Sequence, residues 1–382
     1  MDKLYENIKK HMEMLCLTCG PRQAGSKGSE MATEYIESEF KKMGYETVLE
    51  GYPSIGWDCT KFSLYNVTKD EEVPCATAAY FSPSVNIEDK IMWLKGGDLL
   101  NLDKLDLKGK LCFVEATKIE EGHNRYSEIL DEYGAAGTIF FSTGNPTPNT
   151  KAPRSPFVEK MGVATVGPDG AFYLAKNKED TYRFVVESKK FDHTSYNVIA
   201  RHKGNGKRRA VVGAHFDTAP FIQGANDNAS GTVVMMELAR LMKDKLPEDI
   251  SIDFCGFGVE EYITEVFPAG SGNYVERHKA EGIDWFLNID TAGGILSDRI
   301  LELSHTERLP KLEVKNAGYI TDKVLTGDDK TFSLNDIPTV WLKGIATFGE
   351  LHTFADNLDI ISYERMVEET KDYVDLMTQL LK

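Results

Sequence analysis

Histidine and carboxylate side chains follow three apolar stretches that are typical of buried β-strands, residues 210–214, 250–255 and 285–289. The polar residues after these stretches are His215, Asp217, Glu260, Glu261 and Asp290. Ligand sites in open α/β sheets lie beyond the carboxyl ends of the strands, so we expect these side chains to meet at one edge. Two further candidates lie in loops, namely Asp227, which precedes a predicted helix, and His352, late in the chain.

This combination of residue types favours metal chemistry. Several uncompensated carboxylates in one crevice would repel one another and raise their pKa values unless cations occupied the site. Histidine and carboxylate ligands without thiolates suit Zn²⁺ and tolerate Co²⁺ or Mn²⁺. Two metals about 3.5–4 Å apart need a bridging carboxylate. Asp227 is the candidate for that bridge.

The elements that must position these residues alternate between strands and helices after Ser195, which predicts a mainly parallel sheet flanked by helices. The stretch 339–342 is a further predicted strand. Helices are predicted from the spacing of apolar residues at 4–17, 28–43, 230–243, 271–279 and 362–381. The predicted fold class is therefore α/β.

Residues 57–190 differ from the rest of the chain because short β-like runs are interrupted there by proline and glycine. We expect them to form an inserted β-rich domain, with residues 1–56 and 191–382 making the α/β domain that carries the candidate ligands. Within the insertion, residues 143–156 contain four prolines, Pro146, Pro148, Pro153 and Pro156. Such a segment is expected to be a surface excursion.

Composition excludes several classes of protein. The net charge of −16 and a single basic cluster at 207–209 argue against nucleic-acid or anionic-membrane partners. No apolar stretch approaches the ~20 residues that span a bilayer, and the start of the chain lacks a signal-peptide pattern. Six sparse cysteines, with Cys16 and Cys19 taken as structural thiols, favour a reducing compartment. We therefore expect a cytoplasmic protein.

The ordered motifs resemble the co-catalytic di-zinc aminopeptidase family, which includes aminopeptidase Y and glutamate carboxypeptidases. The motifs are His215-x-Asp217, Gly224-Ala-x-Asp227-Asn-Ala-Ser-Gly231, Glu260-Glu261, Asn288-x-Asp290 and His352-Thr-x-x-Asp356, with Arg22-x-x-Gly25-Ser26 and Tyr196-Asn197-Val-Ile-Ala200 also matching. The segment 57–190 resembles a protease-associated domain, a common insertion in this family. A zinc-exopeptidase-like fold is therefore expected.

The resemblance implies two zinc ions per chain. Their implied ligands are His215, Asp227 and Asp290 for one metal, and Asp227, Glu261 and His352 for the other. Asp217 would bind the second ring nitrogen of His215 and fix its tautomer. Glu260 is the implied general base, which takes a proton from the attacking water and passes it to the leaving amine. A cis peptide bond between Asp227 and Asn228 is also implied.

The chain departs from the family pattern at two places. Residues 262–270 separate Glu261 from Ser271 where many relatives turn at once, and the family sequence Ser-Asp-His appears as Gly327-Asp328-Asp329. Three residues near these departures are candidates for binding the substrate side chain, Tyr262, Asp328 and Phe332. For Phe332, packing in the core is an equal alternative.

The sequence predicts a metal-dependent aminopeptidase whose partners are peptide substrates. A carboxypeptidase or dipeptidase on the same site is the alternative, and it would need Arg or Lys to bind a carboxylate. The catalytic motifs supply neither nearby, which favours recognition of an amine. A non-catalytic peptide-binding relative is a third reading, but such proteins tend to lose ligands or the base, and all are present here. The sequence gives no indication of oligomeric state.

Overall fold

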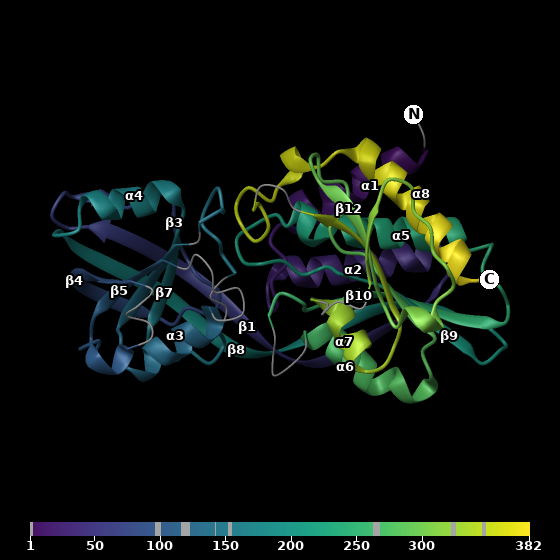
Figure 1. Ribbon diagram of the computed structural model, residues 1–382, viewed down its shortest axis with the longest axis horizontal. Coiled ribbons are helices and arrows are strands. Elements are labelled where there is room, and N and C mark those ends of the chain that lie inside the picture. The colour runs from purple at the N-terminus through teal and green to yellow at the C-terminus, as the bar shows by residue number, and fades with distance from the viewer. Residues whose placement is uncertain are drawn as a thin grey trace.

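The computed structural model describes residues 3–95, 101–115, 123–141, 143–151, 155–262, 268–321, 326–345 and 349–382. A single mixed sheet runs through these residues, and helices flank it (Figure 1). Figure 1 shows two lobes that are joined by the long strands β1 (Glu46–Asn66) and β8 (Thr181–His202). These strands pair antiparallel from Glu46 opposite Arg201 to Asn66 opposite Tyr182, so one ribbon passes through both lobes.

The larger lobe is built on four parallel strands, in the order β14, β11, β9 and β10. Their bounds are Arg208–His215 for β9, Ile250–Phe257 for β10, Trp285–Asn288 for β11 and Thr339–Ile345 for β14. β8 flanks β10 antiparallel, while β12 (Asp298–Ser304) flanks β14 antiparallel and carries β13 (Gly318–Thr321) at its edge. The predicted α/β class with a mainly parallel sheet is confirmed for this lobe.

Helices cover both faces of this sheet. The helices that pack on one another on one face are α1 (Lys3–Glu13), α2 (Lys27–Lys42), α5 (Gly231–Met242) and α8 (Tyr363–Leu380), with the π-helical turn Met14–Cys19 after α1. The opposite face carries α6 (Ala269–His278) and α7 (Asp328–Leu334) (Figure 1). Apolar residues of the sheet pack against each layer in a separate cluster. All five helices predicted from periodicity lie within one or two residues of these bounds at most ends, as expected for amphipathic segments.

The smaller lobe is β-rich. Its strands are β2 (Glu71–Glu72), β3 (Ala76–Ala78), β4 (Val85–Leu94), β5 (Leu111–Glu115), β6 (Gly137–Phe141) and β7 (Gly162–Val166), and its helices are α3 (His123–Glu132) and α4 (Pro168–Lys176). β4 to β7 pair in parallel, and apolar clusters lie on both faces of them. Domain boundaries at residues 57 and 190 stay a prediction, since β1 and β8 continue through them.

The proline-rich stretch 143–156 differs from the predicted surface excursion. Thr150 and Lys151 are buried, with exposed fractions of 0% and 7%, because this stretch lies against the larger lobe. Residues 152–154 fall outside the described residues.

All six cysteines belong to the described ranges and are free thiols, and burial raises the pKa of Cys16 to about 12. Within the described part of the chain, no helix is long and apolar enough to span a bilayer.

A buried charge cluster joins three strands of the larger lobe. Asp253 on β10 is 1% exposed, and it accepts hydrogen bonds from Arg201 Nε at 2.9 Å and Arg209 Nη2 at 2.6 Å. The Tyr274 hydroxyl on α6 donates a third at 2.8 Å. Burial acts to raise the pKa of Asp253, but the arginines outweigh it and hold the pKa below its ordinary value.

Replacing this carboxylate should destabilise the fold. Asp253→Ala leaves two arginines without their buried partner, so we expect a loss of about 3 kcal/mol in the free energy of unfolding at neutral pH, measured by urea denaturation. Because the carboxylate stabilises the fold only while ionised, the difference from wild type should shrink below about pH 4, the ordinary range of an aspartate. Asp58→Ala, at a half-exposed position, is the control. A difference that stays constant down to pH 2.5 would contradict this role of Asp253.

Candidate metal centre

The sheet brings the candidate ligands together at the carboxyl ends of its parallel strands. His215 is the last residue of β9, Glu261 follows β10, and Asp290 follows β11. Asp227 lies in the π-helical turn Ala225–Ser230 that leads into α5, and His352 lies in the loop after β14. The expectation that strand ends deliver these side chains to one edge is confirmed by their distances.

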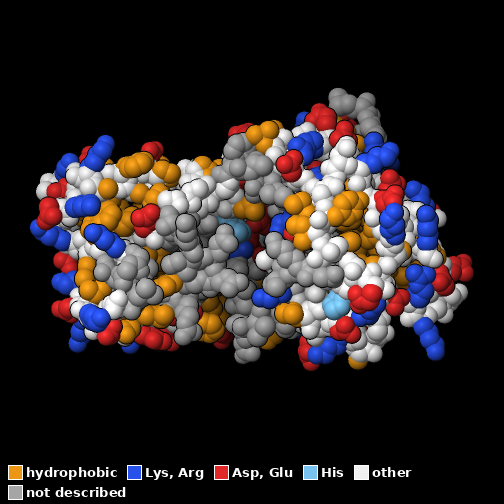
Figure 2. Space-filling model, in the orientation of Figure 1, with side chains coloured by type: hydrophobic (Ala, Val, Ile, Leu, Met, Phe, Trp, Pro, Cys, Tyr) orange, Lys and Arg blue, Asp and Glu red, His pale blue; other side chains and the backbone are white. Residues whose placement is uncertain are grey.

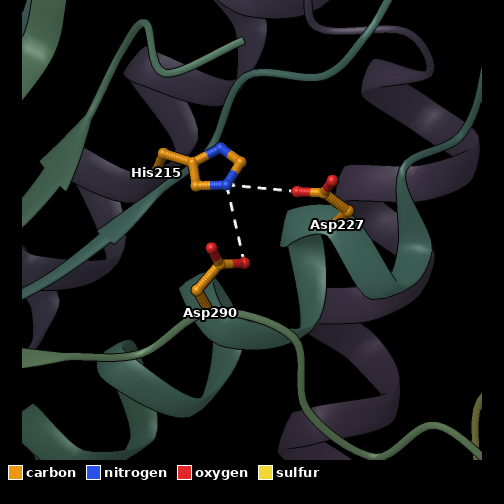
Figure 3. Close-up of side chains that lie close together, drawn as sticks. All are labelled: His215, Asp227 and Asp290. Atoms are coloured by element: carbon orange, nitrogen blue, oxygen red, sulfur yellow. Dashed lines mark ion pairs between the residues drawn. The ribbon is translucent and has the colours of Figure 1, made fainter. Parts of the chain in front are cut away.

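His215, Asp227 and Asp290 form one compact group (Figure 3). His215 Nε2 lies 3.2 Å from Asp227 Oδ1 and 3.6 Å from Asp290 Oδ1. Figure 3 shows both carboxylates pointing toward the same ring nitrogen, one from the turn before α5 and the other from the end of β11. One atom of each side chain could therefore bind a shared cation.

Asp227, Glu261 and His352 form a second group. His352 Nε2 lies 2.9 Å from Asp227 Oδ2 and 3.6 Å from Glu261 Oε2. Asp227 thus presents one carboxylate oxygen to each group, which is the arrangement that a bridging ligand needs. In each group the three candidate ligand atoms lie within 4.8 Å of one another.

The state of these side chains fits cation binding. His215 Nε2 and Asp290 Oδ1 are buried, and neither has a hydrogen-bond partner in the part of the chain that is described. Burial raises the pKa of Asp290, and it raises that of Glu261 to about 7. Burial acts likewise on Asp227, but the two histidines outweigh it and lower its pKa well below the ordinary range. A divalent cation would bind His215 Nε2 and Asp290 Oδ1 and stabilise the ionised carboxylates.

Asp217 links the first group to the strand ends around it. One of its oxygens lies 3.2 Å from His215 Nδ1, which leaves Nε2 directed at the two carboxylates. The same carboxylate accepts the backbone N–H groups of Glu260 at 2.9 Å and of Glu261 at 3.0 Å. Asp217 therefore orients a ligand and also fixes the segment that carries the predicted base. The peptide bond between Asp227 and Asn228 is cis, as the family resemblance implies.

Asp356 positions the bridge, a role that the motif His352-Thr-x-x-Asp356 did not reveal. Its two oxygens accept the backbone N–H groups of Asn226 at 2.7 Å and Asp227 at 3.1 Å. Asp356 is fully buried, so these hydrogen bonds hold the π-helical turn in place from the loop that also carries His352. The spacing of four residues after His352 was the only available signal, and spacing alone does not identify the bonded partner.

Lys151 is the residue that sequence reasoning missed. Its ammonium contacts Glu261 Oε2, lies 3.4 Å from Glu260 Oε2 and lies 3.1 Å from His352 Nε2. Burial acts to lower the pKa of Lys151, but the carboxylates outweigh it and raise the pKa. The expectation that no Lys or Arg lies near the catalytic motifs is therefore wrong. Lys151 is distant from them in sequence, and the contact between the lobes brings it there. Figure 2 shows a hollow between the two lobes in which a histidine and charged side chains of both signs are visible.

The three candidates for the substrate pocket are all buried, and their role in binding the substrate stays a prediction. Phe332 is 0% exposed and stacks on Phe286 with ring centroids 3.8 Å apart, so the core alternative holds. Tyr262 is also 0% exposed and its hydroxyl accepts the backbone N–H of Ile55 at 2.6 Å. Asp328, at 1% exposure, lies close enough to the site that Glu260 and Asp290 add to the effect of burial in raising its pKa. The rest of the predicted rim, 263–267, is outside the described residues.

Known proteins are similar to this chain in sequence and in fold. Residues 197–374 match the model of Peptidase family M28. Aminopeptidase YwaD of Bacillus subtilis is 33% identical over 185 residues, which are 45% of this chain and 36% of that protein. Leucine aminopeptidase 2 of Trichophyton rubrum is 27% identical over 283 residues, 71% of this chain and 54% of that protein. The alignments thus span about half the length of these curated relatives or less.

Two solved structures share the fold over nearly the whole chain. The aminopeptidase from Aneurinibacillus sp. strain AM-1 has a TM-score of 0.71 at 22% identity, with 98% of this chain and 93% of that chain covered. BSAP, a zinc aminopeptidase from Bacillus subtilis, has a TM-score of 0.74 at 18% identity, with coverage of 98% and 94%. The smaller lobe is therefore part of a shared architecture.

Neutralising the shared ligand should empty both groups. Asp227→Asn removes the negative charge that a bridge supplies, so we expect zinc retained after dialysis to fall from about two ions per chain to less than about half an ion. Metal content is measured by elemental analysis. Asp58→Asn is the matched control and should retain the wild-type content. Full occupancy in Asp227→Asn would exclude a bridging role for this residue.

Proposed function

We propose that this chain is a zinc-dependent aminopeptidase that removes N-terminal residues from peptides, because residues 197–374 match the model of Peptidase family M28. The observation that carries the proposal is the pair of ligand groups that share Asp227, with Glu260 directly beside Glu261. The relatives YwaD and leucine aminopeptidase 2 are named as aminopeptidases, which supports the same reaction. A complete ligand set argues against a non-catalytic relative.

The donor set assigns a role to each side chain. Zinc held by these ligands would polarise the scissile carbonyl and lower the pKa of a water. Glu260 would take the proton from the attacking water and deliver it to the nitrogen of the leaving amine. Asp217 would keep His215 in the tautomer that presents Nε2, because it lies beside Nδ1. The buried acidic surroundings favour a substrate that brings a positive charge.

Recognition of an amine is supported by the space beside Gly327. A Cβ atom placed on this residue would lie 3.5 Å from Glu260 Oε1, 3.8 Å from Asp329 Oδ1 and 4.0 Å from Asp290 Oδ2. Three carboxylates thus converge on a position that the glycine, at φ +73°, leaves open. An ammonium is the substrate group that this environment stabilises.

Lys151 is the one observation that favours the second candidate, a carboxypeptidase or dipeptidase. Its ammonium could bind a substrate carboxylate if it left its present contacts. Substrates separate the two readings. Aminoacyl-4-nitroanilides with a free amine should be hydrolysed, and their N-acetylated analogues should react at least about 100-fold more slowly. Preferential release of the C-terminal residue from N-acetylated peptides would instead establish the carboxypeptidase.

Removing the proposed base should abolish turnover without loss of metal. Glu260→Gln keeps the shape of the side chain but cannot accept a proton, so kcat should fall by at least about 100-fold. Zinc content should stay at the wild-type level, because Glu260 is not among the proposed ligands. Glu276→Gln, whose side chain is 76% exposed, is the matched control and should retain activity. An active Glu260→Gln enzyme would place the base elsewhere.

Two further parts of the proposal rest on sequence. We propose that residues 57–190 are a protease-associated domain, on the similarity of their sequence to such insertions. A cytoplasmic location and the absence of nucleic-acid and membrane partners are proposed from the net charge of −16 and the sparse cysteines.

A further inference from the structure

Residues 149–151 of the smaller lobe are hydrogen-bonded to the loop that contains His352. Asn149 and Thr353 form an isolated antiparallel bridge, and the backbone N–H of Thr150 donates to the carbonyl of His352 at 2.8 Å. The backbone N–H of Lys151 is held in turn by Asn149 Oδ1 at 3.0 Å. These hydrogen bonds fix the point from which the Lys151 side chain enters the site.

The Lys151 ammonium contacts the ligands of the second group. It contacts Glu261 Oε2 and lies 3.1 Å from His352 Nε2. These two atoms are 3.6 Å apart, and both are candidate ligand atoms of the second group. The side chain of Lys151 is only 9% exposed, so water contributes little to stabilising its charge. The ammonium is therefore held by the same donors that a cation in the second group would use.

We propose that Lys151 and the metal bound by Asp227, Glu261 and His352 compete for one position, so that the smaller lobe controls how tightly this metal is held. A zinc–ligand distance is about 2.0–2.2 Å, which places the ion within the present contact shell of the ammonium. Two cations at that separation repel strongly in a buried site. Binding of the metal thus requires Lys151 to move away. The identity of the metal rests on the proposed zinc peptidase function.

The competition makes the two metal positions unequal. Among the described residues, the ion pairs and hydrogen bonds of the Lys151 ammonium are with Glu260, Glu261 and His352, and it interacts with the first group only through the charge of the shared Asp227. The ammonium therefore does not occupy the position of the metal between His215 and Asp290. When a metal ion binds the second group, it replaces the Lys151 ammonium as the positive charge beside these carboxylates. Its carboxylates consequently stay compensated with and without metal, which keeps the site folded in both states.

Zinc titration of the metal-free protein tests the proposal. Binding is measured in competition with a chromophoric chelator for wild type, Lys151→Met, Lys151→Gln and Lys151→Arg, with Lys90→Met as the matched control at a position whose side chain is 61% exposed. We expect wild type to bind a second zinc at least about tenfold more weakly than the first. Lys151→Met and Lys151→Gln should tighten the second site by about tenfold or more, whereas Lys151→Arg and Lys90→Met should not.

Lysine labelling provides a readout that needs no variant. Reductive methylation of wild type, followed by peptide mass spectrometry, should modify Lys151 slowly in the metal-free protein and several-fold faster once zinc is saturating, because the displaced ammonium reaches solvent. Lys90 should react equally in both states. This measurement also covers the case in which Lys151→Met fails to fold, for which Lys151→Gln is the second variant.

Two results would overturn the proposal. One is a second-site affinity that agrees within about twofold between wild type and a folded Lys151→Met or Lys151→Gln variant, and the other is Lys151 labelling that does not change with zinc. Neither result bears on the peptidase reaction. Conversely, a wild-type protein that binds two zinc ions with unequal affinity but hydrolyses no aminoacyl substrate would contradict the proposed function and leave the competition intact.

Discussion

The structure of the site depends on one electrostatic constraint, which is that several buried carboxylates must be compensated by cations. Glu261 and Asp290 follow strand ends and Asp227 lies in the turn before α5, and these carboxylates approach one another where little water reaches them. Burial raises the pKa values of Glu261 and Asp290, so the charged forms needed for ligation are unfavourable until a positive charge arrives. The histidines, the lysine from the smaller lobe and the proposed zinc ions all supply positive charge that compensates these carboxylates.

A framework of polar contacts holds the ligands close in spite of their repulsion. Asp217 accepts the backbone N–H groups of Glu260 and Glu261, and Asp356 accepts those of Asn226 and Asp227. Charged hydrogen bonds of this kind are stronger than neutral ones, and they fix main-chain positions rather than flexible side-chain ends. These contacts hold the ligands in position from the protein side, which supports a site that selects its metal.

The smaller lobe takes part in the site through a short segment. The bridge between Asn149 and Thr353 joins it to the His352 loop, while the continuous pair β1 and β8 joins it to the sheet. A lobe attached at both points can place one side chain, Lys151, with the precision that an ion pair requires. Because of this attachment, the candidate ligands Glu261 and His352 in the larger lobe contact Lys151, a residue that lies far from them in sequence.

The sequence alone predicted the α/β fold and the candidate metal ligands, because apolar periodicity and ordered motifs are both visible in the chain. Apolar periodicity marks the helices and strands, and His215, Glu261 and Asp290 follow strands whose ends must meet at one edge. Asp227 and His352 lie in loops, and their motifs marked them as candidates. Tertiary structure decided what has no local signal. Phe332 and Tyr262 are buried in the core, and a contact between the lobes brings Lys151 to Glu261. The sequence around a lysine in a proline-rich loop does not indicate which distant residue it contacts.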